Sequence, residues 1–323
     1  MALNIGFVGT GWVASQHIKS LGQVPEARIV ACADVDADRA AETASRIAGA
    51  AAFGDFRQML DAGGLDAVYV CVPPHVHGEI EMEIIERGIP FFLEKPLANE
   101  LETPRRILEA VEEKGLVTCV GYLMRYQPNV ARVREFLAEH EPITARGAYM
   151  CNVPGVAWWR RKEQSGGQII EQSTHVYDLT RYLFGEVESV YCRGRKGLIK
   201  GEPNYSVDDA SLCSLTFQSG LLCEVTSSCA FPMTEISLEV FAMGGRLKLS
   251  RWPFELTLQT PEETRSYPAT SDVFAEEDRV FVNALLSGDA SAIKSTYADA
   301  FKTMALTCAA EESMAGGQPV RMS

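Results

Sequence analysis

The 323-residue sequence predicts an α/β protein with two domains. Strand-like and helix-like segments alternate as far as residue 121, which favours a doubly wound parallel sheet. A glycine-rich turn joins the first strand-like segment to the first helix-like one. Beyond it, strand-like segments follow one another through short turns, which favours an antiparallel sheet. We therefore expect a parallel-sheet domain over residues 1–121 and an α+β domain with a mostly antiparallel, open sheet over residues 122–323.

The elements of the first domain follow from the spacing of apolar residues. Short apolar runs suit buried parallel strands, and apolar residues three or four apart indicate helices. One expected helix is delimited by Thr103 as N-cap, Pro104 at its first position and Gly115 as its stop. The expected strands are 3–8, 28–33, 67–72, 90–93 and 117–120, and the expected helices are 13–21, 76–87 and 104–114.

The glycine-rich turn predicts a dinucleotide site. Its sequence, Gly9-Thr10-Gly11-Trp12-Val13-Ala14, has the pattern G-x-G-x-x-A. The first glycine permits a tight turn, the second lets the backbone approach a pyrophosphate, and the small third residue allows close packing of helix on strand. The helix that follows offers amide groups and a positive dipole end to phosphates. This combination is typical of the Rossmann fold, and we expect residues 9–13 to contact the cofactor.

An acidic residue ends the second strand. Asp34 lies about 20 residues after the glycines, where a carboxylate binds the ribose 2′-hydroxyl. A carboxylate repels a 2′-phosphate, so NAD is favoured over NADP, although the nearby Arg39 weakens that preference. The alternative is that Asp34 merely begins a turn.

Two further motifs follow strands at the edge of the sheet where ligands of doubly wound folds bind. One is Val72-Pro73-Pro74-His75-Val76-His77, and the other is Glu94-Lys95-Pro96. We interpret the histidine pair as part of a loop that shapes the cofactor pocket, and we expect no metal. Lys95 has an alternative role as a surface lysine at a strand end. The expected cofactor contacts here are Val72, Pro73, His77, Glu94 and Lys95.

A polar stripe marks a later helix. Glu171, His175 and Asp178 stand at i, i+4 and i+7, which places them on one face of a helix whose other positions are apolar. A histidine between carboxylates in a cleft can accept a proton near neutral pH. The alternative is a solvated helix face with an incidental histidine.

The second domain contains several strand-like runs between helices. Gln218-Ser219-Gly220 and Gly244-Gly245 look like hairpin turns. The expected strands are 145–151, 187–193, 210–217, 221–229, 236–242 and 246–249, and the expected helices are 130–139, 274–286 and 295–315.

Taken in order, the motifs resemble the glucose–fructose oxidoreductase, inositol dehydrogenase and MocA (Gfo/Idh/MocA) family of NAD(P)-dependent dehydrogenases. The resemblance rests on the GTGWVA turn, Pro-Pro-His-Val-His, Glu94-Lys95-Pro96, the segment GYLMRYQP at 121–128 and the segment at 166–178. It implies that Lys95 contacts nicotinamide ribose and substrate, and that His175 is the catalytic histidine.

Two departures from the family pattern bear on the substrate. Glu171 stands where the family usually has aspartate, and Ser173 replaces a glycine. The carboxylate therefore reaches about one methylene further, and less room remains beside it. We interpret the variant as a subgroup with a different substrate geometry.

Other residues are expected to line the substrate site. Arg125 and Tyr126 lie at the expected domain junction, and their alternative role is that of ordinary linker residues. Trp158, Trp159 and Arg160 are expected on a loop over the site, where an aromatic ring stacks on sugar or nicotinamide and Arg160 binds hydroxyls or phosphate. The neighbouring tryptophans could equally form a domain or subunit contact. The expected substrate contacts are Arg125, Tyr126, Trp159, Arg160, Glu171, His175 and Asp178.

Composition limits the classes of partner. The net charge of −13 argues against nucleic acid. No apolar run approaches the ~20 residues of a membrane span, and the first strand begins too early for a secretory leader. Nine scattered cysteines without a C-x-x-C pair favour reduced thiols in the cytoplasm. The open sheet makes a homodimer or homotetramer plausible.

Residues and resemblance together predict an NAD-dependent oxidoreductase that interconverts a secondary alcohol and a ketone on a sugar, cyclitol or related polyol. His175 would be the base, Lys95 would stabilise charge on the reacting oxygen, and Glu171 and Asp178 would orient the imidazole or hold hydroxyls. Two alternatives stay open: a non-catalytic sensor of NAD and sugar, and an NAD-dependent glycoside-cleaving enzyme. The presence of both Lys95 and His175 argues against the sensor.

Overall fold

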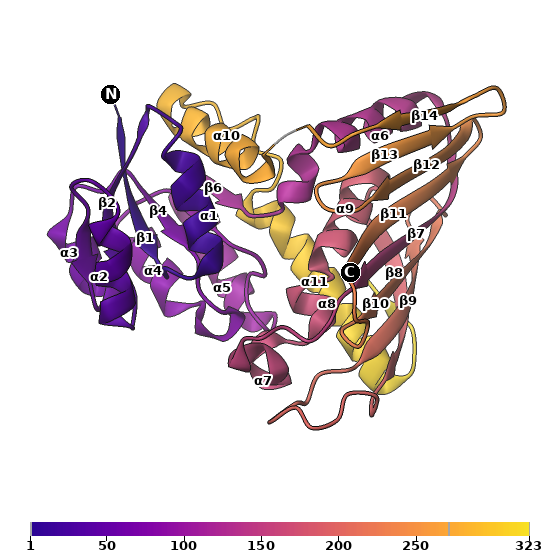
Figure 1. The fold of residues 1–323 in the computed structure, drawn as a ribbon, viewed down its shortest axis with the longest axis horizontal. Helices are drawn as coiled ribbons and strands as arrows, with labels where there is room; N and C mark the ends of the chain where they lie inside the picture. The colour runs from indigo at the N-terminus through magenta and orange to yellow at the C-terminus, as the bar shows by residue number, and fades with distance from the viewer. Residues whose placement is uncertain (1, 271, 323) are drawn as a thin grey trace. The chain divides into compact units, whose positions relative to one another are not determined.

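A computed structural model describes residues 2–270 and 272–322 (Figure 1). The chain forms two compact units. The first comprises residues 1–98, 102–123 and 272–301, and the second comprises residues 99–101, 124–271 and 302–323.

The first unit contains the predicted parallel sheet. Its strands are β1 (Leu3–Val8), β2 (Ala27–Ala33), β3 (Ala51–Phe53), β4 (Ala67–Val70), β5 (Phe91–Leu93) and β6 (Thr118–Val120). They pair in the order β3-β2-β1-β4-β5-β6, and every pairing is parallel. This is the Rossmann arrangement, in which the strand order reverses between β1 and β4. The Pro-Pro-His-Val-His motif follows β4 and Glu94-Lys95-Pro96 follows β5. Both motifs therefore leave the sheet at the edge where ligands bind.

Helices connect the strands of the first unit. They are α1 (Trp12–Leu21), α2 (Ala37–Ser45), α3 (Phe56–Ala62), α4 (Glu79–Glu86) and α5 (Glu102–Lys114), with a short 3-10 turn, η1 (Pro74–Val76). A further helix of this unit, α10 (Val273–Ser287), comes from near the end of the chain. The predicted helix at 76–87 thus divides into η1 and α4. Sequence periodicity did not indicate α2, β3 or α3, because β3 and α3 are short and the apolar residues of α2 are all alanines.

The expected domain boundary needs a correction at the C-terminal end. Residues 272–301, expected in the second domain, pack with the first unit. Phe281 and Val282 of α10 join the same buried cluster as Ile5 and Phe7 of β1, which gives the helix its place beside α1. Further along, the backbone carbonyl of Ser295 accepts a hydrogen bond from the Val120 amide at 2.9 Å.

The second unit contains a nine-stranded sheet. Its strands are β7 (Pro142–Met150), β8 (Val187–Arg195), β9 (Ala210–Phe217), β10 (Leu222–Ser228), β11 (Glu235–Ala242), β12 (Gly245–Ser250), β13 (Glu255–Gln259), β14 (Thr264–Tyr267) and β15 (Val320–Arg321). They pair in the order β14-β13-β12-β11-β7-β10-β9-β8-β15. Only the β7–β10 pairing in this sheet is parallel, so the prediction of a mostly antiparallel sheet is confirmed.

Helices cover one face of this second sheet (Figure 1). The helical segments are η2 (Leu123–Tyr126), α6 (Pro128–Glu139), η3 (Ala157–Arg160), α7 (Lys162–Ser165), α8 (Gln168–Glu171), α9 (Thr174–Phe184) and α11 (Tyr297–Gly316). Apolar side chains of α6, α9 and α11 share one buried cluster with the strands. On the sheet itself, Ile143, Leu212 and Leu222 are exposed.

One expectation about the cysteines is wrong. Cys192 on β8 and Cys213 on β9 form a disulfide. The two residues are directly opposite one another in the antiparallel pairing, which brings their sulfur atoms together. This register comes from the fold and cannot be read from cysteine spacing. The other seven cysteines are free thiols.

Among the described residues, no helix combines the length and apolarity needed to cross a membrane.

Candidate active site

The two glycines of the first turn differ in what surrounds them. Gly9 has φ +86°, and a Cβ atom there would lie 2.3 Å from the carbonyl oxygen of Cys71. Gly11 has φ −72°, and a Cβ there would meet nothing within 4 Å. The first glycine therefore lets β1 turn sharply past the end of β4, whereas the second leaves open space beside the backbone. Among the described residues, no side chain caps α1, so its first amide groups lack a side-chain acceptor.

Asp34 is held in place at the end of β2. One carboxylate oxygen accepts hydrogen bonds from the backbone and side chain of Thr10, each at 2.9 Å. The other accepts from the amide of Asp36 at 2.9 Å and from Arg39 at 2.5 Å. Burial alone would raise the pKa of Asp34, but Arg39 and the other donors bring that pKa below its ordinary value. The group is therefore an anion beside the glycine turn, covered by a half-exposed guanidinium.

The loop after β4 gives His77 a structural role. Its Nδ1 lies 2.6 Å from a carboxylate oxygen of Glu81, whose other oxygen accepts a hydrogen bond from the Gly78 amide at 2.5 Å. The imidazole is buried and helps to fix the start of α4. Val72 and Pro73 are half-buried and remain predicted cofactor contacts. A contact through the buried His77 ring is not supported.

Glu94 and Lys95 follow β5. Glu94 is buried, and its Oε2 accepts a hydrogen bond from the backbone amide of Lys95 at 3.1 Å. Its Oε1 lies 3.1 Å from Nε2 of His17 on α1. Lys95 is half-buried, and the Lys95–Pro96 peptide bond is cis. The buried carboxylate thus holds the backbone of the half-buried lysine.

The described part of the chain holds one group of three potential metal ligands. His17, Glu94 and Glu277 each place one ligand atom within 4.8 Å of the others, and all three residues are buried. The pair singled out in the sequence, His75 and His77, does not belong to it.

The predicted polar helix is interrupted. The backbone N–H of Ser173 donates to the carbonyl of Gln168, five residues earlier, at 2.8 Å. Such a π-type turn inserts one residue into the helical repeat and rotates the faces before and after it. Helix α8 therefore ends at Glu171 and α9 begins at Thr174, so the expectation of one continuous stripe is wrong.

The three members of the stripe consequently have different surroundings. Glu171 and His175 are both half-buried, on either side of the interruption. Asp178 is fully buried one turn later. The interruption leaves the first two side chains partly accessible and directs the third into the interior of the unit.

Trp159 is buried and contacts Glu171. Its indole Nε1 donates a hydrogen bond to Oε2 of Glu171 at 2.7 Å. The ring packs in a small cluster with Cys151, Val207 and Cys229. The buried ring does not offer a face for stacking on a ligand, as the sequence led us to expect of Trp159, because long-range packing draws it inward, where it contacts the Glu171 carboxylate.

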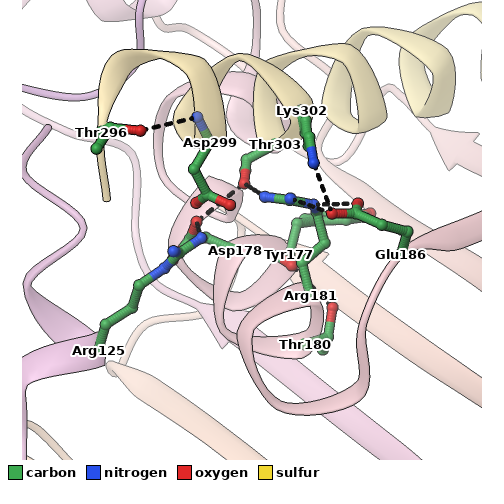
Figure 2. A network of polar contacts seen from close by, with 10 residues as sticks. All are labelled: Arg125, Tyr177, Asp178, Thr180, Arg181, Glu186, Thr296, Asp299, Lys302 and Thr303. Carbon is green, nitrogen blue, oxygen red and sulfur yellow. Dashed lines mark hydrogen bonds and ion pairs between the residues drawn. The ribbon is translucent and has the colours of Figure 1, made fainter. Parts of the chain in front are cut away.

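Arg125 and Asp178 are paired with one another (Figure 2). The guanidinium makes two hydrogen bonds to the carboxylate, at 2.7 and 2.5 Å, and both side chains are buried. The Thr303 hydroxyl donates to Asp178 at 2.9 Å, and Arg181 donates to Thr303 at 2.7 Å. Burial raises the pKa of Asp178, and Arg125 opposes that rise. These contacts join η2, α9 and α11 and give the carboxylate a structural role.

Two other predicted substrate contacts differ in accessibility. Tyr126 is buried, whereas Arg160 is partly exposed and forms an ion pair with Glu202 at 3.1 Å. The Arg160 guanidinium is thus accessible enough to contact a ligand.

Comparison with known proteins identifies the family. The model of an oxidoreductase family with an NAD-binding Rossmann fold matches residues 3–122, and that of the GFO/IDH/MocA C-terminal domain matches residues 131–248. The scyllo-inositol 2-dehydrogenase (NAD(+)) of Bacillus subtilis (strain 168) is 31% identical over 249 residues, covering 74% of this chain and 71% of that protein. The chain belongs to the GFO/IDH/MocA family.

Other family members match over nearly the full length. The myo-inositol 2-dehydrogenase of Thermotoga maritima is 25% identical over 334 residues, covering 99% of this chain and 98% of that protein. A structure of levoglucosan dehydrogenase in complex with NADH and levoglucosan superposes with a TM-score of 0.91 at 22% identity, covering 100% of both chains. That likeness shows a shared fold.

As a GFO/IDH/MocA member, the chain is an NAD-dependent oxidoreductase, and its own geometry fits the cofactor. The open space at Gly11 and the uncapped start of α1 suit a pyrophosphate. The anionic Asp34 suits a ribose hydroxyl. Trp12 and Val13 begin the helix beside this space, and Trp12 is exposed.

Sequence reasoning did not find the interior partners of the site. His17, Glu277 and Asp278 were not singled out, although His17 was visible as a histidine in the helix after the glycine turn. No local signal connects Trp159 to Glu171, because that contact depends on how distant segments pack.

Proposed function

We propose that this GFO/IDH/MocA member interconverts a secondary alcohol and a ketone on a sugar, cyclitol or related polyol. Support comes from the curated relatives that match nearly its whole length, which include inositol 2-dehydrogenases. The chain also keeps a lysine after β5 and a histidine at the start of α9, the two groups that such a reaction requires.

The reaction transfers a hydride from the substrate carbon and a proton from its hydroxyl, and each transfer needs its own group. Bound NAD supplies the hydride acceptor. His175 takes the proton of the substrate hydroxyl, for which an imidazole near neutrality is suited. Lys95 donates a hydrogen bond to the reacting oxygen and stabilises the negative charge that develops there.

The observation that carries this assignment is the interruption between α8 and α9. It leaves Glu171 and His175 partly accessible, and the indole of Trp159 holds the Glu171 carboxylate at 2.7 Å. We propose that Glu171 orients the imidazole of His175 or holds a neighbouring substrate hydroxyl. Arg160 binds substrate hydroxyls, whereas Arg125 and Asp178 position the elements that carry these groups.

Cofactor preference and assembly are part of the same proposal. Asp34 favours NAD over NADP through charge repulsion of a 2′-phosphate, with Arg39 moderating the effect.

Ile143, Leu212 and Leu222 on the sheet of the second unit support a homo-oligomer that covers these exposed apolar side chains.

An absorbance screen at the NADH band tests the reaction. The purified chain is incubated with monosaccharides, cyclitols and sugar acids, each with NAD and with NADP. We expect NADH to form from NAD with at least one polyol, and NADPH to form more slowly from NADP. Binding of NAD and sugar without NADH would favour the sensor, and glycoside cleavage without net NADH would favour the elimination enzyme. Either result would contradict the proposal.

A further inference from the structure

A buried ionic cluster lies in the first unit behind Lys95. His17, on α1, has no exposed surface. Its Nδ1 lies 2.7 Å from Oδ1 of Asp278 on α10, and its Nε2 lies 3.1 Å from Oε1 of Glu94 after β5. One imidazole thus bridges the Asp278 carboxylate of α10 and the carboxylate that precedes Lys95.

The hydrogen bonds of this imidazole define its charge. Each ring nitrogen faces a carboxylate oxygen. A nitrogen that faces an ionised carboxylate must donate, and an imidazole that donates from both nitrogens is a cation. Burial alone would lower the pKa of His17, but Asp278 and Glu94 together raise it well above its ordinary value. The two facing carboxylates and the raised pKa both favour the protonated ring.

The Glu94 carboxylate connects His17 to the backbone of Lys95. While Oε1 contacts His17, Oε2 accepts the hydrogen bond of the Lys95 amide at 3.1 Å. A Cβ atom on Gly121 would lie 2.6 Å from Oε1, so the carboxylate fills all the space that this glycine leaves. A side chain at residue 121 would therefore displace the carboxylate from the lysine backbone.

Aromatic rings enclose the cluster. The His17 ring lies 4.9 Å from Phe92, 5.2 Å from Phe274 and 5.4 Å from Tyr69, measured between ring centroids. In an environment of this kind, charged hydrogen bonds are stronger than in water. The cluster is therefore suited to hold a backbone rigidly.

We propose that His17 is a positioning residue for Lys95: clamped between Asp278 and Glu94, it fixes the carboxylate that holds the Lys95 backbone. The proposal rests on the proposed function for the catalytic role of Lys95. It assigns α10, more than 170 residues further along the chain, a direct part in placing the ammonium group.

The neighbouring Glu277 completes the cluster. Both of its carboxylate oxygens are buried without a hydrogen-bond partner among the described residues. Burial raises the pKa of Glu277 well above its ordinary value, and the neighbouring His17 opposes that rise. The other titratable groups facing the cluster are Tyr69 and Cys71, and burial raises the pKa of each, so both are neutral.

The test compares His17→Gln and Asp278→Asn with the intact chain, and His140→Gln serves as the matched control. His140 lies in the second unit and stacks on Phe136. We expect both cluster variants to lower kcat by about 10- to 100-fold, as misplacement of a catalytic group does. The Kd for NAD should change little. Hydrogen exchange at the Lys95 amide should accelerate in both variants and stay unchanged in the control.

A pH profile separates positioning from a loss of stability. Removing the Asp278 charge lowers the pKa of His17 toward its ordinary value, and the clamp needs the protonated ring. The kcat of Asp278→Asn should therefore decline as pH rises through that lowered pKa, whereas the intact chain shows no such decline there. A purely structural role would lower the melting temperature without changing the pH profile.

Two results would overturn the proposal. One is a pair of folded variants with unchanged kcat and unchanged exchange at Lys95. The other is a stoichiometric metal ion found in the purified chain by elemental analysis, because Nε2 of His17 would then be a ligand instead of a donor. Faster exchange at Lys95 in a chain that oxidises no polyol would support the clamp and refute the proposed function.

Discussion

At the scale of single residues, the glycine turn shows how one residue type meets two different physical demands. Gly9 is required by backbone conformation and by the nearby Cys71 carbonyl. Gly11 has an ordinary conformation and open surroundings, so only a ligand would need its lack of a side chain. Both glycines were predicted from the pattern alone, but the pattern does not separate these two reasons.

This contrast predicts different outcomes for two alanine substitutions. Gly9→Ala should lower the free energy of unfolding by about 2 kcal/mol or more, because a left-handed alanine is strained and its Cβ overlaps a carbonyl. Gly11→Ala should leave that free energy near the wild-type value and weaken NAD binding. Denaturant unfolding and NAD titration measure the two effects. Equal stability of the two variants would contradict this interpretation.

The ionised state of Asp34 predicts a pH dependence of stability. Its pKa is lower in the folded chain than in the unfolded chain, so its contribution to stability is present above the unfolded value of about 4 and is lost as pH falls through the folded value. The free energy of unfolding of the Asp34→Asn variant should therefore fall less than that of the wild type as the pH is lowered from 5 to below the folded pKa of Asp34. Thermal melts over this range provide the measurement, with Asp38→Asn on α2 as control. Parallel acid profiles for wild type and Asp34→Asn would refute the prediction.

At the scale of elements, the interruption between α8 and α9 decides which polar residues can meet a substrate. The i, i+4, i+7 spacing predicts one stripe for a regular helix, but one inserted residue separates its members. Residue spacing predicted the helix and its polar positions. The insertion was not predictable, because it depends on the partners that Glu171 and Asp178 find in Trp159 and Arg125.

The buried pair of Arg125 and Asp178 predicts a large stability effect. Asp178→Ala should lower the free energy of unfolding by about 3 to 5 kcal/mol, because it leaves a buried guanidinium without its carboxylate. Glu255→Ala, which breaks the exposed pair with Arg251, should cost about 1 kcal/mol or less. Chemical denaturation measures both. Similar costs for the two variants would show that the Arg125 pair does not hold η2, α9 and α11 together.

At the scale of the whole molecule, the chain completes its first unit with a segment from near its end. The alternation of strands and helices predicted the parallel sheet, and the hairpin turns predicted the antiparallel one. The return of α10 to the first unit was not predicted, because an amphipathic helix fits many apolar surfaces equally well in sequence. The same limit applies to the Cys192–Cys213 disulfide, which depends on strand register.

The place of α10 predicts how fragments fold. A fragment of residues 1–121 lacks Phe281 and Val282 and should not unfold cooperatively, because its buried cluster is incomplete. The same fragment joined by a glycine–serine linker to residues 272–301 should regain a cooperative thermal transition by circular dichroism. A cooperative transition in the shorter fragment would show that α10 is dispensable.

The most direct test of polyol oxidation by Lys95 and His175 measures turnover and NAD binding together. With a polyol from the absorbance screen, His175→Asn and Lys95→Met should each lower kcat by at least about 100-fold, the loss expected when a positioned proton acceptor or an electrostatic contact is removed. Both variants should bind NAD with nearly unchanged affinity. Near-wild-type turnover of His175→Asn at neutral pH would contradict the proposed chemistry.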